Sequence, residues 1–478
     1  MKLRRKNVCQ TCREHKIGCD GNRPSCSQCR HTGRVCTGYP PDFEFISTNG
    51  QGRQRANDTG TRANDSLMAN RASNQENCLT RTIAPAIQDA ANLIIRSYVP
   101  ENEIPWLNQI QDTQPRICGG WVATLPELLV VSGSDELLPA AVKTLALAIA
   151  SKRSQLRVIS PTLWQSYGST VKLLQQSLSR CGGSCNNEHL AAMMCLTLTE
   201  VSLTLRPLCC DWMVHIDGIS TIIQHLGPEF FARGIPHKLF IGFRPLLVLK
   251  AIISRTPSFL TNERWIIGPF QDIPASPMQQ LLTEAVAIPS VLKRIDLLHT
   301  YPAAMANSGG KVLQDALRTI LQRLCSWEDR YESKFTGPLY WPHAVGISRP
   351  EDICLWFNDV TVANALTHYW AFTAICLVYI QKLELANKTH VLNDAVRQQY
   401  VRPLTLICRS IPFLLQESLN LYGSSSVAFL ISTVLEIFKW NEQHGGTEII
   451  LHRHAVDYAK SQGFYFASSG GLDLGCEG

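Results

Sequence analysis

The stretch that decides how the N-terminal part folds reads Cys9-Gln-Thr-Cys12-Arg-Glu-His-Lys-Ile-Gly-Cys19-Asp-Gly-Asn-Arg-Pro-Ser-Cys26-Ser-Gln-Cys29-Arg-His-Thr-Gly-Arg-Val-Cys36. Its six cysteines form two Cys-x2-Cys pairs, and each pair is followed by another cysteine after six intervening residues. Apart from cysteine, its only aliphatic side chains are Ile17 and Val35. Because so few apolar residues cannot form a hydrophobic core, bonds made by the cysteines must hold this stretch together.

Disulfides and metal ions are the two chemistries that can join clustered cysteines. A secretory signal needs an apolar run of about 7–15 residues after its basic start, and the chain runs from Met1 to Cys9 without one. We therefore expect a reducing, intracellular environment, in which clustered thiols tend to be metal ligands. Zinc prefers four tetrahedral ligands, and a Cys-x2-Cys turn brings two thiolates to one ion. Six sulfurs cannot complete two separate zinc sites, so we expect two of them to bridge in a unit that folds on metal.

Positive charge is concentrated around the same stretch. Residues 1–36 hold nine Lys and Arg against two acids, a net charge of +7, whereas the whole chain carries +6. The rest of the chain therefore has a net charge of −1. This distribution points to one small surface that meets a polyanion.

With these features, residues 7–38 resemble the fungal binuclear zinc cluster DNA-binding domain of fungal transcription regulators. The likeness includes Arg13, Lys16, Asp20 and Pro24. It implies two zinc ions, two short helices beginning near Cys9 and Cys26, and a turn between them at Pro24. One zinc ion is then held by Cys9, Cys12, Cys19 and Cys26. The other is held by Cys9, Cys26, Cys29 and Cys36, so that Cys9 and Cys26 bridge.

The expected DNA contacts are basic residues on the first helix or just before it: Arg4, Arg5, Lys6, Arg13, His15 and Lys16. Lys and Arg donate hydrogen bonds to guanine O6 and N7 in the major groove, and the resemblance implies that Lys16 and His15 read a CGG-like triplet. The remaining basic groups would contact phosphates. Gly18 and His15 replace basic residues common in the family, so we expect weaker binding with a shallower salt dependence.

The chain is too long for one structural unit, since single cores rarely exceed about 250–300 residues. We expect a zinc cluster domain at 1–40, a flexible linker at 41–80, an all-α domain at 81–467 and a tail at 468–478. The linker lacks the apolar heptads of a coiled coil. Two alternatives stay open: a homodimer formed through the large domain, or a single cluster that binds alone.

Helical periodicity marks the large domain, and 45% of the whole chain is hydrophobic, enough for a sizeable core. Helices are expected from Pro161, over 211–226 and over 313–331, from their caps and apolar spacing. The run 369–380 is apolar but only twelve residues long, so it predicts a buried helix rather than a membrane span. Segments 212–218 and 257–265 look like the fungal-specific regulatory domain that often follows the zinc cluster, which implies a regulatory scaffold.

Motifs for common enzyme chemistries are missing from the sequence, including the His-Glu-x-x-His zinc helix, the Gly-x-Ser-x-Gly elbow and the Walker phosphate loop. We therefore expect no enzyme. The sequence is interpreted as a nuclear transcription regulator that binds double-stranded DNA at CGG-like promoter elements, with no membrane partner. Whether it activates or represses is open; family habit favours activation of metabolic or secondary-metabolite pathway genes through the RNA polymerase II transcription machinery. The alternative is a zinc- or redox-sensing regulator that acts through protein partners.

Overall fold

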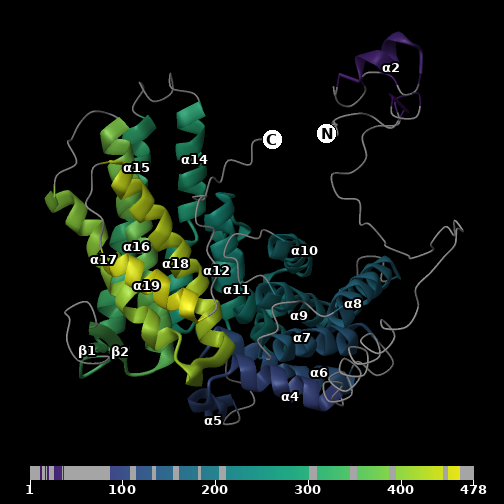
Figure 1. The fold of residues 1–478 in the computed structure, drawn as a ribbon, viewed down its shortest axis with the longest axis horizontal. Helices are drawn as coiled ribbons and strands as arrows, with labels where there is room; N and C mark the ends of the chain where they lie inside the picture. The colour runs from purple at the N-terminus through teal and green to yellow at the C-terminus, as the bar shows by residue number, and fades with distance from the viewer. Residues whose placement is uncertain are drawn as a thin grey trace, which may run out of the picture. The chain divides into compact units, whose positions relative to one another are not determined.

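The computed structural model describes residues 11–12, 15, 17, 19–20, 26–34, 36, 87–107, 115–131, 136–153, 161–180, 185–203, 211–300, 309–344, 353–386, 394–444 and 450–462. The chain divides into two units, Met1–Asn74 and Gln75–Gly478 (Figure 1). Each unit is described by itself.

The first unit is built around cysteine. Helix α2 (Ser27–His31) begins directly after Cys26, which is its N-cap. The buried residues of its small core are Cys12, Cys26 and Cys29, with Ile17, Cys19 and Cys36 packed against them. Among the described residues, sulfur therefore occupies the centre where a larger domain would place aliphatic side chains.

The second unit is helical. Its first helices are α4 (Ile87–Tyr98), α5 (Ile104–Leu107), α6 (Leu125–Val131), α7 (Leu137–Arg153), α8 (Pro161–Arg180), α9 (Asn187–Leu203), α10 (Asp211–Leu226), α11 (Gly234–Ser254) and α12 (Glu263–Ile267). They are followed by α13 (Pro277–Ala285), α14 (Ile288–Thr300), α15 (Gly310–Glu332), α16 (Val360–Ala386), α17 (Asp394–Leu414), α18 (Asn420–Gln443) and α19 (Ile450–Ser461). Short 3-10 turns connect them: η1 (Glu101–Glu103), η2 (Cys118–Thr124), η3 (Pro228–Phe231), η4 (Phe259–Thr261), η5 (Gly268–Phe270) and η9 (Glu417–Leu419).

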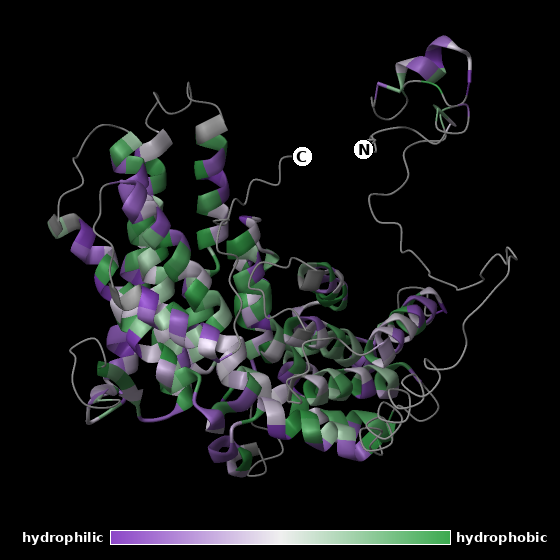
Figure 2. Ribbon diagram, viewed as in Figure 1, coloured by the Kyte–Doolittle hydropathy of each residue, from purple (hydrophilic) through white to green (hydrophobic). Residues whose placement is uncertain are grey.

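The helices predicted from sequence are confirmed at three places. Helix α8 starts at Pro161, α10 spans Asp211–Leu226, and α15 contains the predicted stretch 313–331. Helix α8 is amphipathic because Leu163, Thr170 and Leu174 are buried on one face while much of the rest is exposed. Figure 2 shows this mixture of hydrophilic and hydrophobic residues on outer helices, whereas the central helices are mainly hydrophobic.

One two-stranded hairpin adds to the expected all-α array. Strand β1 (Tyr340–Ala344) pairs antiparallel with β2 (Ile353–Phe357), so that Tyr340 lies opposite Phe357. Aromatic and β-branched residues favour this conformation. The ring centroids of Trp356 and Phe357 lie 5.5 and 5.1 Å from that of Phe413 on α17. These contacts anchor the hairpin to the helices.

Helix α16 is the centre of the second half of the unit. It packs against α15, α17 and α18. By length and composition, α16 and the stretch Glu417–Gln443 resemble membrane spans, but 83% and 61% of their most apolar windows are buried inside the protein. The apolar run 369–380 lies within α16, and ten of its twelve residues are buried. The buried-helix prediction is therefore confirmed.

One continuous hydrophobic core joins the two halves of the unit, from Ala90 on α4 to Ala459 on α19. Figure 1 shows α4 and α6–α9 gathered in one group and α15–α19 in another, with α11 between them. Helix α11 contacts α9 of the first group. It also contacts α13 and α14, which in turn contact α15 of the second group.

Candidate metal centre and nucleic-acid interface

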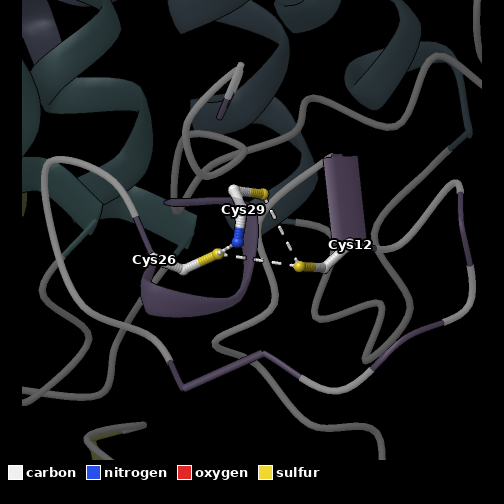
Figure 3. Close-up of side chains that lie close together, drawn as sticks. All are labelled: Cys12, Cys26 and Cys29. Carbon is white, nitrogen blue, oxygen red and sulfur yellow. Dashed lines mark hydrogen bonds between the residues drawn. The ribbon is translucent and has the colours of Figure 1, made fainter. Parts of the chain in front are cut away.

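Three cysteines converge at the centre of the first unit. The Sγ atom of Cys12 lies 3.6 Å from that of Cys26 and 3.8 Å from that of Cys29 (Figure 3). A disulfide would bring the sulfurs to about 2.05 Å, so no disulfide joins Cys12 to Cys26 or to Cys29. Around a tetrahedral zinc ion with Zn–S bonds of about 2.3 Å, neighbouring sulfurs lie about 3.8 Å apart. The observed spacing therefore fits ligands of one metal ion.

A second group of ligand atoms overlaps the first. The side chains of Cys19, Asp20 and Cys26 place one ligand atom each within 4.8 Å of one another, as do those of Cys12, Cys26 and Cys29. Cys26 belongs to both groups, which is the position that a bridging thiolate requires. The bridging role of Cys26 itself stays a prediction.

The resemblance assigns Cys12 and Cys29 to different zinc ions, yet their sulfurs are 3.8 Å apart. The structure thus brings the expected terminal ligands of the two ions side by side. Cys36 is half-buried against the same core, and Cys9 lies outside the described residues. The division of the six sulfurs between two ions stays a prediction.

Local hydrogen bonds fix the orientation of helix α2. The Sγ atom of Cys26 accepts the backbone N–H of Cys29 at 3.3 Å, and the carboxylate of Asp20 accepts the N–H of Ser27 at 3.1 and 3.2 Å. Both acceptors satisfy N–H groups that the first turn of a helix leaves unpaired. Asp20 belongs to the family likeness, but the sequence did not predict its capping contact, for which an acid six residues before the N-cap is the only signal.

The end of α2 turns the chain back toward Cys36. Gly33 has a φ of +65°, the left-handed conformation that commonly ends a helix, and the N–H of Arg34 donates to the carbonyl of Cys29 at 2.9 Å. Because glycine adopts positive φ without steric cost, Gly33 suits this position.

The basic residues of the first unit that the structure describes are all exposed. His15 is exposed, as a DNA-reading residue requires, while Arg4, Arg5, Lys6, Arg13 and Lys16 lie outside the described residues. The structure also exposes Arg30 and His31 in the last turn of α2, and Arg34 beyond it. The predicted DNA contacts omitted these three, although their clustering in the sequence was a visible signal.

Comparison with known proteins locates a family match at the N-terminus. Residues 7–44 match the fungal Zn(2)-Cys(6) binuclear cluster domain. The sorbicillinoid biosynthetic cluster transcription factor sor3 of Hypocrea jecorina is 46% identical over 55 residues, which are 12% of this chain and 8% of that protein. The aspercryptin biosynthesis cluster-specific transcription regulator atnN of Emericella nidulans is 50% identical over 38 residues, 8% of this chain and 6% of that protein.

The likeness covers less than a tenth of the length of either relative, and no solved structure matches the chain. The regulatory-domain resemblance of residues 81–467 therefore stays a prediction. Both relatives are named as transcription regulators rather than enzymes, in agreement with the sequence prediction for this chain. Residues 7–44 therefore match the fungal Zn(2)-Cys(6) binuclear cluster domain, and the proteins similar to this part of the chain are named as transcription regulators.

Proposed function

We propose that this chain is a nuclear, zinc-dependent regulator of transcription that binds DNA in a sequence-specific manner. The observation that carries the proposal is the convergence of Cys12, Cys26 and Cys29 at zinc-ligand spacing, within a segment that matches the binuclear cluster domain. A unit with so small an apolar core depends on metal for its fold. Two zinc ions per chain are the expected complement.

DNA reading is assigned to the basic residues on the first predicted helix and just before it. Lys16 and His15 would read a CGG-like triplet in the major groove, and Arg13 would contact phosphates. Arg4, Arg5 and Lys6 would contact phosphates and set the register of the unit on the duplex. Support comes from the net charge of +7 over residues 1–36 and from the exposure of His15.

The target genes are proposed from the names of the relatives alone. Those names refer to the sorbicillinoid and aspercryptin biosynthetic clusters. We assign this chain to the regulation of secondary-metabolite pathway genes. The resemblance to the zinc cluster family favours activation together with the RNA polymerase II machinery.

Titration of the zinc-loaded full chain onto two labelled duplexes tests the DNA-reading role. One duplex carries a CGG triplet and the other the same bases scrambled. Lys16→Ala should weaken binding to the CGG duplex by about 5–150-fold, the range for loss of one good base contact. It should leave binding to the scrambled duplex nearly unchanged.

Lys311→Ala is the matched control, because Lys311 is an exposed lysine on α15 of the second unit. It should leave both affinities unaltered. Equal affinity of the unmodified chain for the CGG and scrambled duplexes would contradict CGG reading. Regulation through protein partners would then be the better account.

A further inference from the structure

A cavity of about 410 Å³ lies in the second unit, where residues of η2, α13, α15, α16 and α18 meet. Small-molecule sites commonly have volumes of about 300–1,000 Å³. A smaller cavity of about 110 Å³ adjoins it. Four residues line both, namely Cys118, Met278, Asn364 and Tyr422. We call the first the outer cavity and the second the inner cavity.

Charged side chains line the outer cavity. Arg116 and Lys334 are cationic, and among the described lining residues Asp359 is the one acid. Arg116 Nη2 donates to Asp359 Oδ2 at 2.8 Å, and its Nε lies 3.8 Å from the carboxylate of Glu103. Glu103 is buried, and this burial raises the pKa of its carboxyl group. The residues that line the cavity therefore carry two cations and one acid, while Glu103 contacts Arg116 without being part of the lining.

Helix N-termini add to the positive potential. Helix α13 begins at Pro277 and α16 at Val360, and the residues that precede them, Ser276 and Asp359, line the outer cavity. The N-terminus of a helix carries a partial positive charge. Two helices of nine and 27 residues therefore start at the wall of the same cavity.

A buried arginine lies close behind this wall. Arg244 on α11 is fully buried and donates from Nη1 to the backbone carbonyl of Gln279 at 2.6 Å. In the part of the chain that the structure describes, no carboxylate pairs with it. Burial lowers the pKa of Arg244 to about 10, so it is still charged at neutral pH. The Gln279 side chain donates to Cys118 Sγ at 3.6 Å, which connects the arginine to the shared wall.

The shared wall also contains an unsatisfied acceptor. Asn364 is 7% exposed, and its Nδ2 donates to the hydroxyl of Tyr422 at 3.1 Å. Its Oδ1 is buried and accepts no hydrogen bond from any described residue. Leaving such a buried acceptor unpaired is unfavourable. A ligand that carries a hydrogen-bond donor would remove that cost.

The inner cavity is mainly apolar. Trp121, Met194 and Leu198 contribute to its lining, together with the face of α11 around Leu249. Burial of an aliphatic or aromatic group there would be favourable.

We propose that the two cavities form a binding site for a small organic carboxylate with an apolar body. The carboxylate would lie in the outer cavity near Arg116 and Lys334, and the apolar body would occupy the inner cavity. A hydroxyl or amino group on the ligand would donate to Asn364 Oδ1. The site lies wholly within the second unit, so it is independent of the proposed DNA reading.

Calorimetric titration of the zinc-loaded full chain with 3-phenyllactate tests this site without any DNA. The neutral amide, 3-phenyllactamide, has nearly the same shape but no charge. The carboxylate should bind at least about tenfold more tightly than the amide. Lys334→Glu should weaken carboxylate binding by about tenfold and leave amide binding nearly unchanged. Lys334 is exposed, so this substitution should not prevent folding.

Two further variants sharpen the test. Lys311→Glu, at the other end of α15, makes the same charge change far along the helix and should have no effect. Asn364→Leu should reduce the preference for 3-phenyllactate over 3-phenylpropionate, which lacks the hydroxyl donor. The proposal is overturned by equal binding of carboxylate and amide, by no binding of either carboxylate up to about 10 mM, or by an unchanged affinity of the Lys334→Glu variant.

Discussion

The carboxylate of Asp20 ties the loop after the third cysteine to the helix that follows the fourth. Its two oxygens lie 3.1 and 3.2 Å from the backbone nitrogen of Ser27. Cys19 and Cys26, on either side of this contact, are both expected zinc ligands. The bond therefore holds two ligand-bearing segments together at a place where almost no apolar packing is available.

Asp20→Ala should weaken zinc binding by the full chain. Loss of a helix cap costs about 1 kcal/mol, and in a unit whose folding is coupled to metal this corresponds to about fivefold lower apparent zinc affinity. Competition with a coloured zinc chelator measures the change. Gln28→Ala, an exposed position on α2, is the control. If the Asp20→Ala and Gln28→Ala variants have the same apparent zinc affinity, the capping contact does not stabilise the metal site.

His368 gives the stability of the helical unit a predictable pH dependence. It is 3% exposed, its Nδ1 lies 2.8 Å from the carbonyl oxygen of Asn364, and its ring stacks on Phe429. Burial lowers the pKa of His368 to about 4 from the ordinary value of 6.5. Between these values the unfolded chain binds a proton at this histidine and the folded chain does not, so stability falls as the pH falls from about 6.5 to about 4.

His368→Gln should remove this contribution. The free energy of unfolding of the unmodified chain should drop between pH 7 and pH 5 by about 2 kcal/mol more than that of the variant. Urea unfolding followed by helical circular dichroism measures both. An equal drop in the two proteins would show that His368 takes up its proton without opposing the fold.

At the residue level the sequence predicted the metal-binding residues better than it predicted contacts between distant side chains. The spacing of the six cysteines was enough to propose a metal cluster, because ligand geometry is written in local sequence. The buried Arg244, by contrast, bonds to Gln279 and Thr283, 35 and 39 residues away. No local pattern reports which helices will pack together, so neither this contact nor the cavities were foreseen.

Two helical glycines show how packing decides the effect of the same substitution. Gly168 on α8 has open space where a Cβ would be added. A Cβ added to Gly423 on α18 would overlap the backbone carbonyl oxygen of Leu414, at the end of α17. Glycine allows this close approach of the two helices.

Gly168→Ala should stabilise the protein by about 0.5–1 kcal/mol, since alanine is the better helix former. Gly423→Ala should instead destabilise it by about 1–3 kcal/mol, because backbone must move to relieve the overlap. Thermal unfolding of both variants makes the comparison. A higher melting temperature for both variants would contradict the close approach of Gly423 to the carbonyl of Leu414.

Helices were predicted well where caps and periodicity agreed, as for the start of α8 at Pro161 and the full length of α10. The hairpin of β1 and β2 was missed. Each strand is five residues long, and Pro342 interrupts the first. Strands this short do not show the alternation of polar and apolar residues that predicts a β-strand. The hairpin is held in place by aromatic contacts with Phe413 on α17, far along the chain.

For the whole molecule, the division into two units predicts different responses to metal removal. The helical unit has a continuous hydrophobic core of its own, whereas the N-terminal unit is built around cysteine. Treatment with a strong zinc chelator should abolish specific DNA binding, while the helical circular dichroism signal and the melting temperature stay nearly unchanged. Elemental analysis of the untreated chain should find two zinc ions. Specific DNA binding that survives complete zinc removal would contradict the metal-dependent fold.

The central claim is that the zinc cluster of this chain reads DNA sequence, and a binding-site selection tests it most directly. Random duplexes are presented to the zinc-loaded full chain at moderate salt, and bound sequences are recovered, with Lys16→Ala treated in parallel. The account predicts enrichment of CGG-like triplets, lost in the variant; one triplet would indicate a monomer and two at fixed spacing a dimer. No enrichment from a chain that carries two zinc ions would contradict it.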